Sequence, residues 1–338
     1  MIIVMGRDVT DAEIGAVVKR LETAGLKANI SRGIERTVIG AIGDERQLTE
    51  EMFTSLPGVE SAMHIAKQYK IVSRESHRAN TVIDIGGIPL GGRQIQVIAG
   101  PCSVETQEQM DLSARYVHEA GCRMMRGGAF KPRTSPYTFQ GKGKEGLDMF
   151  RKAAAPYKLP IVTELMDARQ IDLFLEYDVD VIQIGTRNMQ NFDLLKEVGR
   201  INKPVILKRG MSATISEWLM SAEYIAAGGN HNIIFCERGI RTFETAYRNV
   251  LDVTAIPVLK KETHLPVIVD PSHAGGKAWM VPALSQAAIA AGADALLVEM
   301  HPNPCEAWCD ADQALTPQEL KNLMGTLGGI ANAIGRTL

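Results

Sequence analysis

The fold is decided by a short apolar run that ends in a turn, IQVIAGPC at residues 95–102. Seven further apolar runs follow it, and longer segments of helical character separate them. The eight runs are 95–99, 123–125, 161–162, 181–184, 205–207, 233–236, 267–269 and 295–298. Continuous apolar runs are typical of parallel strands, which are buried on both faces. Eight alternations of strand and helix over roughly 240 residues predict a (β/α)₈ TIM barrel.

An open, doubly wound parallel sheet is the alternative architecture for this pattern. Such a sheet usually carries a glycine-rich G-x-G-x-x-G turn after its first strand. This chain has Gly100-Pro101-Cys102 at that place. We therefore expect the closed barrel.

The first 72 residues have a pattern of their own. Strands are expected at 2–5, 26–30, 37–42 and 59–65, and helices after Thr10 and at 47–56. The order βαββαβ is that of a ferredoxin-like fold. We expect the polar segment SRESHRAN, residues 73–80, to link this small domain to a catalytic barrel at 81–338, which opens with a hairpin around Gly86-Gly87.

The composition of the 338 residues excludes several classes of protein. Hydrophobic residues make up 45% of the chain and the formal net charge is -2, so we expect neither nucleic acid nor an anionic membrane as partner. No segment approaches the ~18 unbroken apolar residues of a membrane span, and no signal peptide is evident. The five cysteines are widely scattered, which favours a reducing, cytoplasmic location over a disulfide framework.

Five basic side chains follow four of the predicted strands, at the end of the barrel where catalytic groups lie. They are Arg126, Lys131, Arg187, Lys208 and Arg238. Converging cations repel one another unless an anion binds them, and the arginine fork fits phosphate and carboxylate. The pattern predicts a small, multiply anionic ligand such as a phosphorylated carboxylic acid. A surface salt bridge remains the alternative for any single one of these residues.

Four residues of another kind follow strands one, seven and eight: Cys102, His273, Glu299 and Asp310. These strands are neighbours in a closed barrel, so a thiolate, an imidazole and two carboxylates would meet there. Such a mixed set fits a divalent transition ion, although a buried cysteine and a helix-capping histidine remain alternatives. Cys305 and Cys309 are expected to be ordinary thiols rather than a second metal or redox pair.

The Gly- and Pro-rich loop expected at 127–143 is long for a βα loop, as functional lids and binding loops often are. Seven motifs at the strand ends resemble those of one enzyme family. The motifs are AGPC at 99–102, RGGA at 126–129, KPRTSP at 131–136, QIG at 183–185, LKRG at 207–210, CERG at 236–239 and DPSH at 270–273. In combination they resemble the 3-deoxy-D-arabino-heptulosonate 7-phosphate (DAHP) synthases over about residues 81–338. The N-terminal unit resembles the ferredoxin-like regulatory extension of some members.

The resemblance implies condensation of phosphoenolpyruvate with erythrose 4-phosphate, the entry step of the shikimate pathway to chorismate and the aromatic amino acids. It implies one divalent metal of the Mn, Fe, Co or Zn class on Cys102, His273, Glu299 and Asp310. It assigns phosphoenolpyruvate to Arg126, Lys131, Arg187, Lys208 and Arg238, and erythrose 4-phosphate to Arg133 and Thr134. We expect Lys131, Cys102 and His273 to be catalytic, and we infer that Glu164 positions the attacking water.

Two other functions stay open at the level of sequence. The sister enzyme 3-deoxy-D-manno-octulosonate 8-phosphate synthase shares most motifs but differs at the segment that reads KPRT here, at 131–134. A non-catalytic phosphate sensor would need neither the metal set nor that segment. One departure from the family is Ala311, where glycine is more common, and it makes Asp312 a less suitable ligand. We also expect a homotetramer that is inhibited by tyrosine or phenylalanine.

Overall fold

The computed structural model describes residues 1–33, 36–43, 45, 48–63 and 68–338. Two compact units make up the chain. The first contains Met1–Ala79 with Lys261–His264, and the second contains Asn80–Lys260 with Leu265–Leu338. The domain limits and the linker expected from the sequence stay predictions.

The first unit is a four-stranded antiparallel sheet with two helices. Its elements are β1 (Ile2–Met5), α1 (Asp11–Thr23), β2 (Lys27–Arg32), β3 (Thr37–Ile42), α2 (Glu51–Thr54) and β4 (Val59–Met63). The strands lie in the order β2-β3-β1-β4. This arrangement confirms the predicted ferredoxin-like fold.

The start of α1, the longer helix of this unit, is determined by a capping box. Thr10 and Glu13 form a capping box, in which the Thr10 side chain accepts from the Glu13 N–H and the Glu13 carboxylate accepts from the Thr10 N–H. Helix α2 spans only Glu51–Thr54 and is therefore shorter than the predicted helix at 47–56. Residues 47, 64 and 65 of the predicted elements lie outside the described residues.

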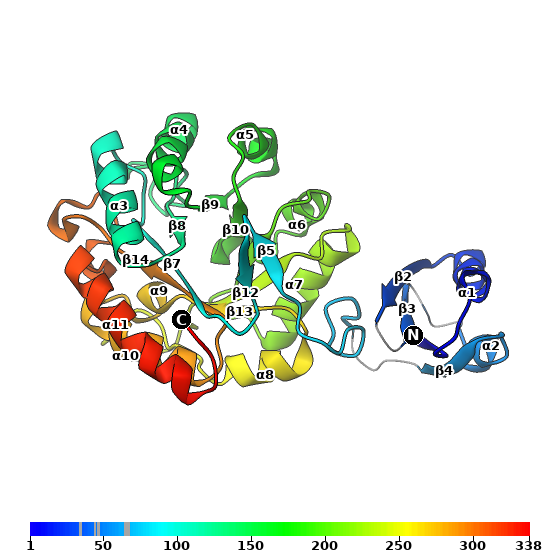
Figure 1. Ribbon diagram of the computed structural model, residues 1–338. Helices are drawn as coiled ribbons and strands as arrows, with labels where there is room; N and C mark the ends of the chain where they lie inside the picture. The colour runs from blue at the N-terminus through cyan, green and yellow to red at the C-terminus, as the bar shows by residue number, and fades with distance from the viewer. Residues whose placement is uncertain (34–35, 44, 46–47, 64–67) are drawn as a thin grey trace. The chain divides into compact units, whose positions relative to one another are not determined.

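The second unit is a closed barrel of eight parallel strands, as the sequence predicts (Figure 1). The strands are β7 (Gln96–Gly100), β8 (Met124–Arg126), β9 (Ile161–Leu165), β10 (Val181–Ile184), β11 (Val205–Lys208), β12 (Ile233–Glu237), β13 (Val267–Val269) and β14 (Ala295–Glu299). Each strand pairs with the next along the chain, and the register Glu299 to Gly100 closes β14 onto β7. The carboxyl ends of all eight strands therefore meet at one end of the barrel.

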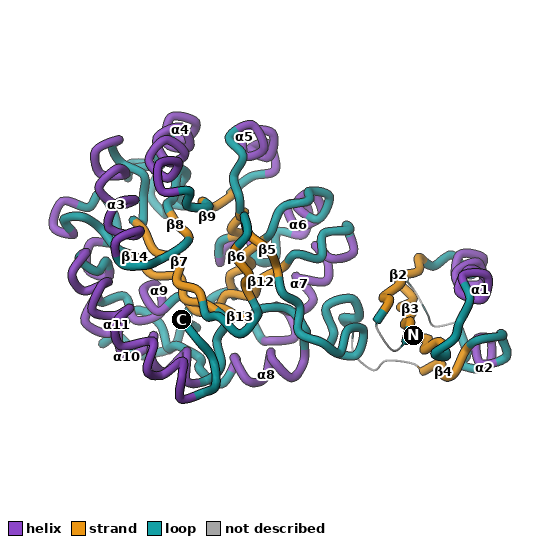
Figure 2. The backbone as a smooth tube through the Cα atoms, viewed as in Figure 1, coloured by secondary structure: helices purple, strands orange, loops and turns teal. Residues whose placement is uncertain are grey.

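Helices follow the strands around the outside of the barrel (Figure 2). They are α3 (Gln107–Glu119), α4 (Gly143–Ala154), α5 (Ile171–Glu176), α6 (Phe192–Val198), α7 (Ile215–Ala227), α8 (Ala255–Glu262), α9 (Pro271–Gly275), α10 (Val281–Ala290) and α11 (Pro317–Ala333). The loop after β8 is long and extends to Gly143, where α4 begins. The expected long loop at 127–143 is confirmed.

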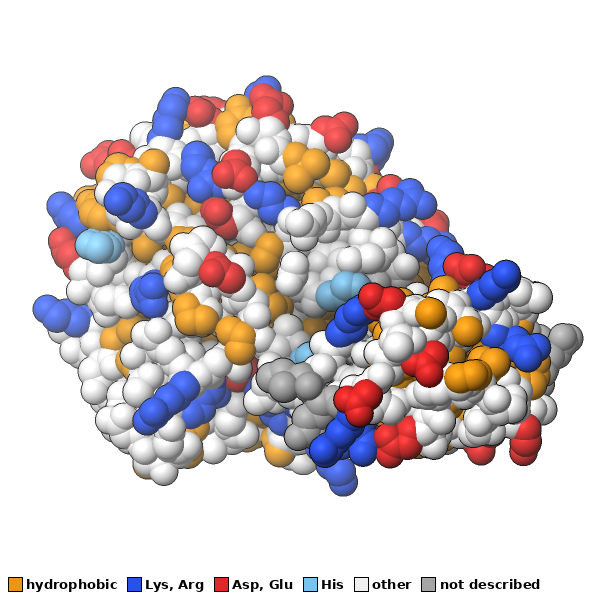
Figure 3. Space-filling view, turned by 45° about the vertical axis from the view of Figure 1, so that its right-hand side comes forward, with side chains coloured by type: hydrophobic (Ala, Val, Ile, Leu, Met, Phe, Trp, Pro, Cys, Tyr) orange, Lys and Arg blue, Asp and Glu red, His pale blue; other side chains and the backbone are white. Residues whose placement is uncertain are grey.

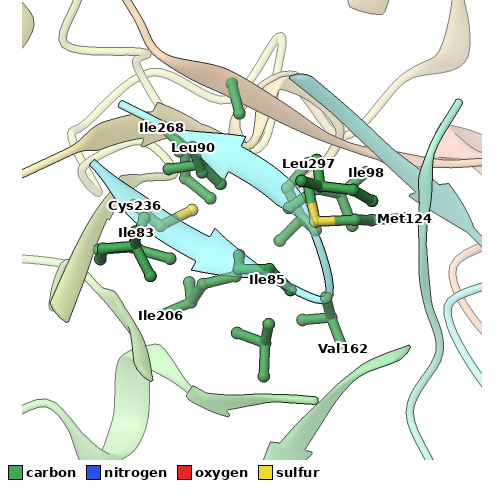
Figure 4. Close-up of a cluster of buried hydrophobic side chains, with 14 residues drawn as sticks. Ile83, Ile85, Leu90, Ile98, Met124, Val162, Ile206, Cys236, Ile268 and Leu297 are labelled. Carbon is green, nitrogen blue, oxygen red and sulfur yellow. The ribbon is translucent and has the colours of Figure 1, made fainter. Parts of the chain in front are cut away.

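A short hairpin closes the amino-terminal end of the barrel. Its strands are β5 (Ile83–Ile85) and β6 (Ile88–Leu90), joined by Gly86 and Gly87, which both have positive φ angles. The apolar side chains of the hairpin pack among strand residues inside the barrel, including Ile98, Met124 and Leu297 (Figure 4). The hairpin therefore fills the amino-terminal end of the barrel, and the polar strand-end residues lie at the opposite end.

Charged side chains of both signs are interspersed over the surface seen in Figure 3. None of the helices in the described residues is long and apolar enough to cross a membrane. All five cysteines lie in the described part of the chain, and each is a free thiol.

Candidate active site

A cavity of about 380 Å³ lies at the carboxyl end of the barrel. Its wall includes all five cations that the sequence predicts there. It also includes Arg133 and Thr134 from the loop after β8, Glu164 of β9, and the metal-ligand candidates His273 and Asp310. The predicted anion-binding residues and half of the predicted metal ligands therefore share one cavity.

The four predicted metal ligands lie together. One potential ligand atom from each of Cys102, His273, Glu299 and Asp310 falls within 4.8 Å of the others. The Cys102 Sγ lies 3.2 Å from Asp310 Oδ2, and His273 Nε2 lies 3.4 Å from Glu299 Oε1. Thiolate, imidazole and carboxylate at this spacing match the donors that divalent transition ions take in proteins.

Asp270 orients the imidazole of His273. Its Oδ1 accepts from the backbone N–H of His273 at the start of α9, and its Oδ2 lies 2.7 Å from His273 Nδ1. Lys208 donates to the same Oδ2 at 2.5 Å. This carboxylate fixes Nδ1, so Nε2 points at the other ligands, as metal-binding histidines require.

Buried charge surrounds Asp270 and His273. Burial would raise the pKa of Asp270, but His273 and Lys208 lower that pKa well below its usual value. Burial lowers the pKa of His273, which favours the neutral imidazole that binds metals.

Arg126 ties the end of β8 to the end of β14. Its NH1 donates to Glu299 Oε1 at 2.9 Å and to the carbonyl of Pro101 at 2.7 Å. Its Nε is buried and has no hydrogen-bond partner within the described residues. Burial raises the pKa of Glu299, but His273 and Arg126 lower it below its ordinary value. The unpartnered Nε leaves one buried donor for a ligand.

Lys131 and Cys102 lie in direct contact. The ammonium of Lys131 donates to the Cys102 carbonyl at 2.9 Å and lies 3.0 Å from the Cys102 Sγ. A hydrogen bond with Cys309 and burial raise the pKa of the Cys102 thiol well above its usual value. The thiol therefore has to release a proton when it binds a metal.

The other predicted cations differ in their exposure. Lys208 and Arg238 are buried, whereas Arg187 is exposed on the wall of the cavity. Burial lowers the pKa of Arg238 below its ordinary value. A cationic wall of this kind is suited to an anion that displaces water from it.

Glu164 lies in β9, opposite Gln183 of β10. The amide of Gln183 donates to its Oε2 at 3.3 Å. A Cβ at Gly185 would lie 1.9 Å from Glu164 Oε1, so only glycine leaves room for this carboxylate. The QIG motif therefore places Glu164 in the cavity wall.

The loop that carries Arg133 and Thr134 contacts the loop after β14. Arg133 Nε donates to the Phe139 carbonyl at 3.1 Å within its own loop. The Phe139 and Trp308 rings meet edge to face with centroids 5.0 Å apart, and the Lys142 ammonium lies 5.8 Å from the Trp308 ring. Trp308 therefore links this loop to the segment that carries Asp310.

Comparison with known proteins identifies the family. The profile of the DAHP synthetase I family matches residues 71–334, and that of the DAHP synthase ferredoxin-like domain matches residues 1–67. The chain belongs to the DAHP synthetase I family. It is therefore an enzyme of DAHP synthesis, as the motifs predict, and the family is generally metal-dependent.

A phospho-2-dehydro-3-deoxyheptonate aldolase of Thermotoga maritima is 50% identical over 99% of both chains. A crystal structure of a DAHP synthase from that organism superimposes with a TM-score of 0.79 and covers 99% of this chain and 98% of its own. A 2-dehydro-3-deoxyphosphooctonate aldolase of Syntrophotalea carbinolica is 31% identical over 72% of this chain and 93% of its own. The octulosonate enzymes are thus distant members of the same superfamily.

Several residues that line or adjoin this cavity are not predicted by the sequence pattern. Arg241, Arg248 and Asn249 line it from the loop after β12, and Gln313 contacts Glu299. No apolar run precedes any of these residues directly, and Gln313 carries no charge, so the strand-end pattern gives no signal for them. The exposed Asp312 pairs with Lys277 at 2.7 Å, away from the ligand cluster.

Other polar residues at or after strand ends make contacts between loops. Arg209 NH1 pairs with Glu237 Oε2 at 2.9 Å and with Asp252 Oδ2 at 2.8 Å, which joins the loops after β11 and β12. Cys305 is exposed, whereas Cys309 is buried and donates to Ser103 Oγ at 2.9 Å. The two cysteines therefore have different environments.

Proposed function

We propose that the cavity is the site at which phosphoenolpyruvate condenses with erythrose 4-phosphate to give DAHP and inorganic phosphate. The observation that supports this most is the shared cavity, where a wall of cations adjoins a four-residue metal cluster. The first substrate is a trianion and the second is a phosphorylated aldehyde. The cations suit phosphoenolpyruvate, and a metal ion on the cluster would suit the aldehyde of erythrose 4-phosphate.

Cys102, His273, Glu299 and Asp310 would hold one divalent metal ion of the Mn, Fe, Co or Zn class. The donor set fits such an ion, because His273 is oriented by Asp270 and Cys102 contacts Asp310. When bound, the metal supplies a Lewis acid that polarises the aldehyde oxygen. Cys102 and His273 serve catalysis by holding it there.

Arg126, Lys131, Lys208, Arg238 and Arg187 would bind phosphoenolpyruvate. The first four are buried, so they act in a medium where charge is poorly screened. Among the residues that the structure describes, none is a hydrogen-bond partner of the buried Arg126 Nε, and Lys131 lies beside Cys102. These cations orient the enol carbon toward the aldehyde and stabilise the charge that develops as phosphate leaves.

Arg133 and Thr134 would bind the phosphate of erythrose 4-phosphate, since both line the cavity from one loop. Glu164 would position the water that attacks the enol-ether carbon. The hydrogen bond from Gln183 and the room that Gly185 leaves for the carboxylate support this role, because Glu164 lines the same cavity as the cations.

Regulation and assembly belong to the same proposal. Tyrosine or phenylalanine would inhibit the enzyme through the ferredoxin-like domain, and the protein would act as a cytoplasmic homotetramer. Light scattering of the purified protein tests the assembly, and inhibition assays with each aromatic amino acid test the effector.

A phosphate-release assay tests the activity. Phosphate should be released from phosphoenolpyruvate with erythrose 4-phosphate but not with arabinose 5-phosphate, and a chelator should abolish release until metal is restored. Turnover with arabinose 5-phosphate alone would indicate the octulosonate reaction, and no turnover with either aldose would favour a phosphate sensor.

Two cysteine variants test the metal site. Cys102→Ser should lose most activity and bound metal, because it removes the thiolate ligand. Cys122→Ser is the matched control, since Cys122 is also buried but lies outside the ligand cluster. Full activity of chelator-treated Cys102→Ser protein would contradict the assignment.

A further inference from the structure

Gln313 is a buried polar residue beside the metal cluster, and the proposed reaction gives it no role. Its side chain is only 2% exposed. Nε2 donates to Glu299 Oε2 at 2.7 Å, and Oε1 accepts from Arg248 NH1 at 2.9 Å. A buried amide with partners on both sides has a defined orientation.

The chemistry of the two partners fixes which way this amide points. An ionised carboxylate only accepts hydrogen bonds, and a guanidinium only donates them. The NH₂ group of Gln313 must therefore face Glu299, and its carbonyl must face Arg248. A flipped amide would lose both hydrogen bonds at once.

The two carboxylate oxygens of Glu299 have different partners. Oε1 accepts from Arg126 at 2.9 Å and lies 3.4 Å from His273 Nε2, so it faces the ligand cluster. Oε2 is occupied by Gln313. The carboxylate is thereby held with Oε1 toward the ligand cluster and Oε2 on the amide of Gln313.

Arg248 extends the same chain of contacts to the cavity. It lines the cavity wall, and its NH1 lies 3.7 Å from Asp310 Oδ1. A Cβ at Gly276 would lie 2.5 Å from the Arg248 Cβ, so the glycine makes room for this arginine. Arg248 and Gln313 therefore contact two of the four ligand residues between them.

We propose that Gln313 is a positioning residue that holds Glu299 for metal binding through a single oxygen, and that Arg248 fixes the amide of Gln313. The inference rests on the proposed metal site. Partners of metal ligands orient those ligands, and their loss typically weakens metal affinity about 10- to 100-fold. Gln313→Met keeps the length of the side chain and removes both hydrogen bonds.

Cobalt(II) binding to the full-length protein tests the inference. The affinity is measured by competition with a chelator, and the geometry by the thiolate-to-cobalt and d–d absorption bands. Gln313→Met should bind Co²⁺ about 10- to 100-fold more weakly and shift the d–d bands. Arg248→Met should produce a smaller change in the same direction.

The control is Asp312→Asn in the same short turn, because Asp312 is exposed and pairs with Lys277. It should bind Co²⁺ like the unaltered protein. Unchanged affinity and spectra in both Gln313→Met and Arg248→Met would overturn the inference, and Arg248→Met alone decides it if Gln313→Met does not fold. Absence of a thiolate band in the unaltered protein would instead refute the proposed metal site.

Discussion

Lys131 and Arg187 line the same cavity but differ in what surrounds them. Lys131 is buried against Cys102, whereas Arg187 is exposed on the wall. Burial would lower the pKa of Lys131, but the neighbouring cysteines and Glu299 raise it, so the ammonium stays charged. Under the proposed function, both side chains would contact phosphoenolpyruvate, Lys131 from a buried place and Arg187 from the cavity wall.

Lys131→Ala and Arg187→Ala should each weaken phosphoenolpyruvate binding by about 1.5–3 kcal/mol, the range for hydrogen bonds to charged groups. Calorimetry or the KM for phosphoenolpyruvate measures the effect. Lys144→Ala is the control, because Lys144 is exposed and pairs with Glu176 on the helix α5 side. Unchanged binding in both cavity variants would mean that they are only surface charges.

The site residues that the sequence predicts are those at strand ends. Cys102, Arg126, Lys208 and Glu299 stand at or next to the ends of apolar runs, so the barrel topology alone predicts that they converge. Arg248 comes from the middle of an irregular loop. Its contacts depend on the path of that loop, which residue periodicity does not encode.

The loop after β8 and the loop after β14 form a linked pair of elements through Trp308. Its backbone N–H donates to Glu105 Oε1 at 2.9 Å, and its ring contacts Phe139 and Lys142. One side of this link leads to Arg133 and the other to Asp310. The link is thus placed to affect the proposed site for erythrose 4-phosphate.

Trp308→Ala should raise the KM for erythrose 4-phosphate roughly 2- to 10-fold, because an aromatic pair contributes about 0.5–1.5 kcal/mol. The KM for phosphoenolpyruvate should change little. Trp279→Ala is the matched control, since Trp279 is 77% exposed. An equal change in both KM values would point to a general loss of structure.

The hairpin of β5 and β6 supports the barrel from its closed end. Leu90 is fully buried among the strand side chains, whereas Val82, just before the hairpin, is 51% exposed. Leu90→Ala should lower the free energy of unfolding by about 2–5 kcal/mol, as is usual for deletions in a packed core. Denaturant unfolding measures it, and Val82→Ala should change it far less.

At the scale of the whole molecule, the order of elements could be predicted, but their limits could not. Eight apolar runs correspond to the eight barrel strands, because burial on both faces leaves a continuous pattern. Helix α2 is shorter than predicted, since apolar spacing alone does not tell a helix of one turn from a longer one. The Glu237–Arg209–Asp252 cluster also shows that a polar strand end can serve packing between loops.

The division into two units leads to a prediction about regulation. We expect residues 1–70 to regulate rather than catalyse, because the cavity and the ligand cluster consist of residues from 102 onward. An effector acts only if it binds two states of the enzyme unequally, and a coupling of about 1–3 kcal/mol changes activity severalfold or more.

Deletion of residues 1–70 should therefore leave an active barrel that tyrosine and phenylalanine no longer inhibit. Phosphate release with and without each amino acid measures this, and light scattering of both forms measures assembly. A folded but inactive barrel, or one that is still inhibited, would refute the regulatory role. The alternative is that the domain only holds subunits together, since contacts between subunits can stabilise the folded protein. In that case truncation should change the size of the assembly, and no aromatic amino acid should inhibit the full-length enzyme.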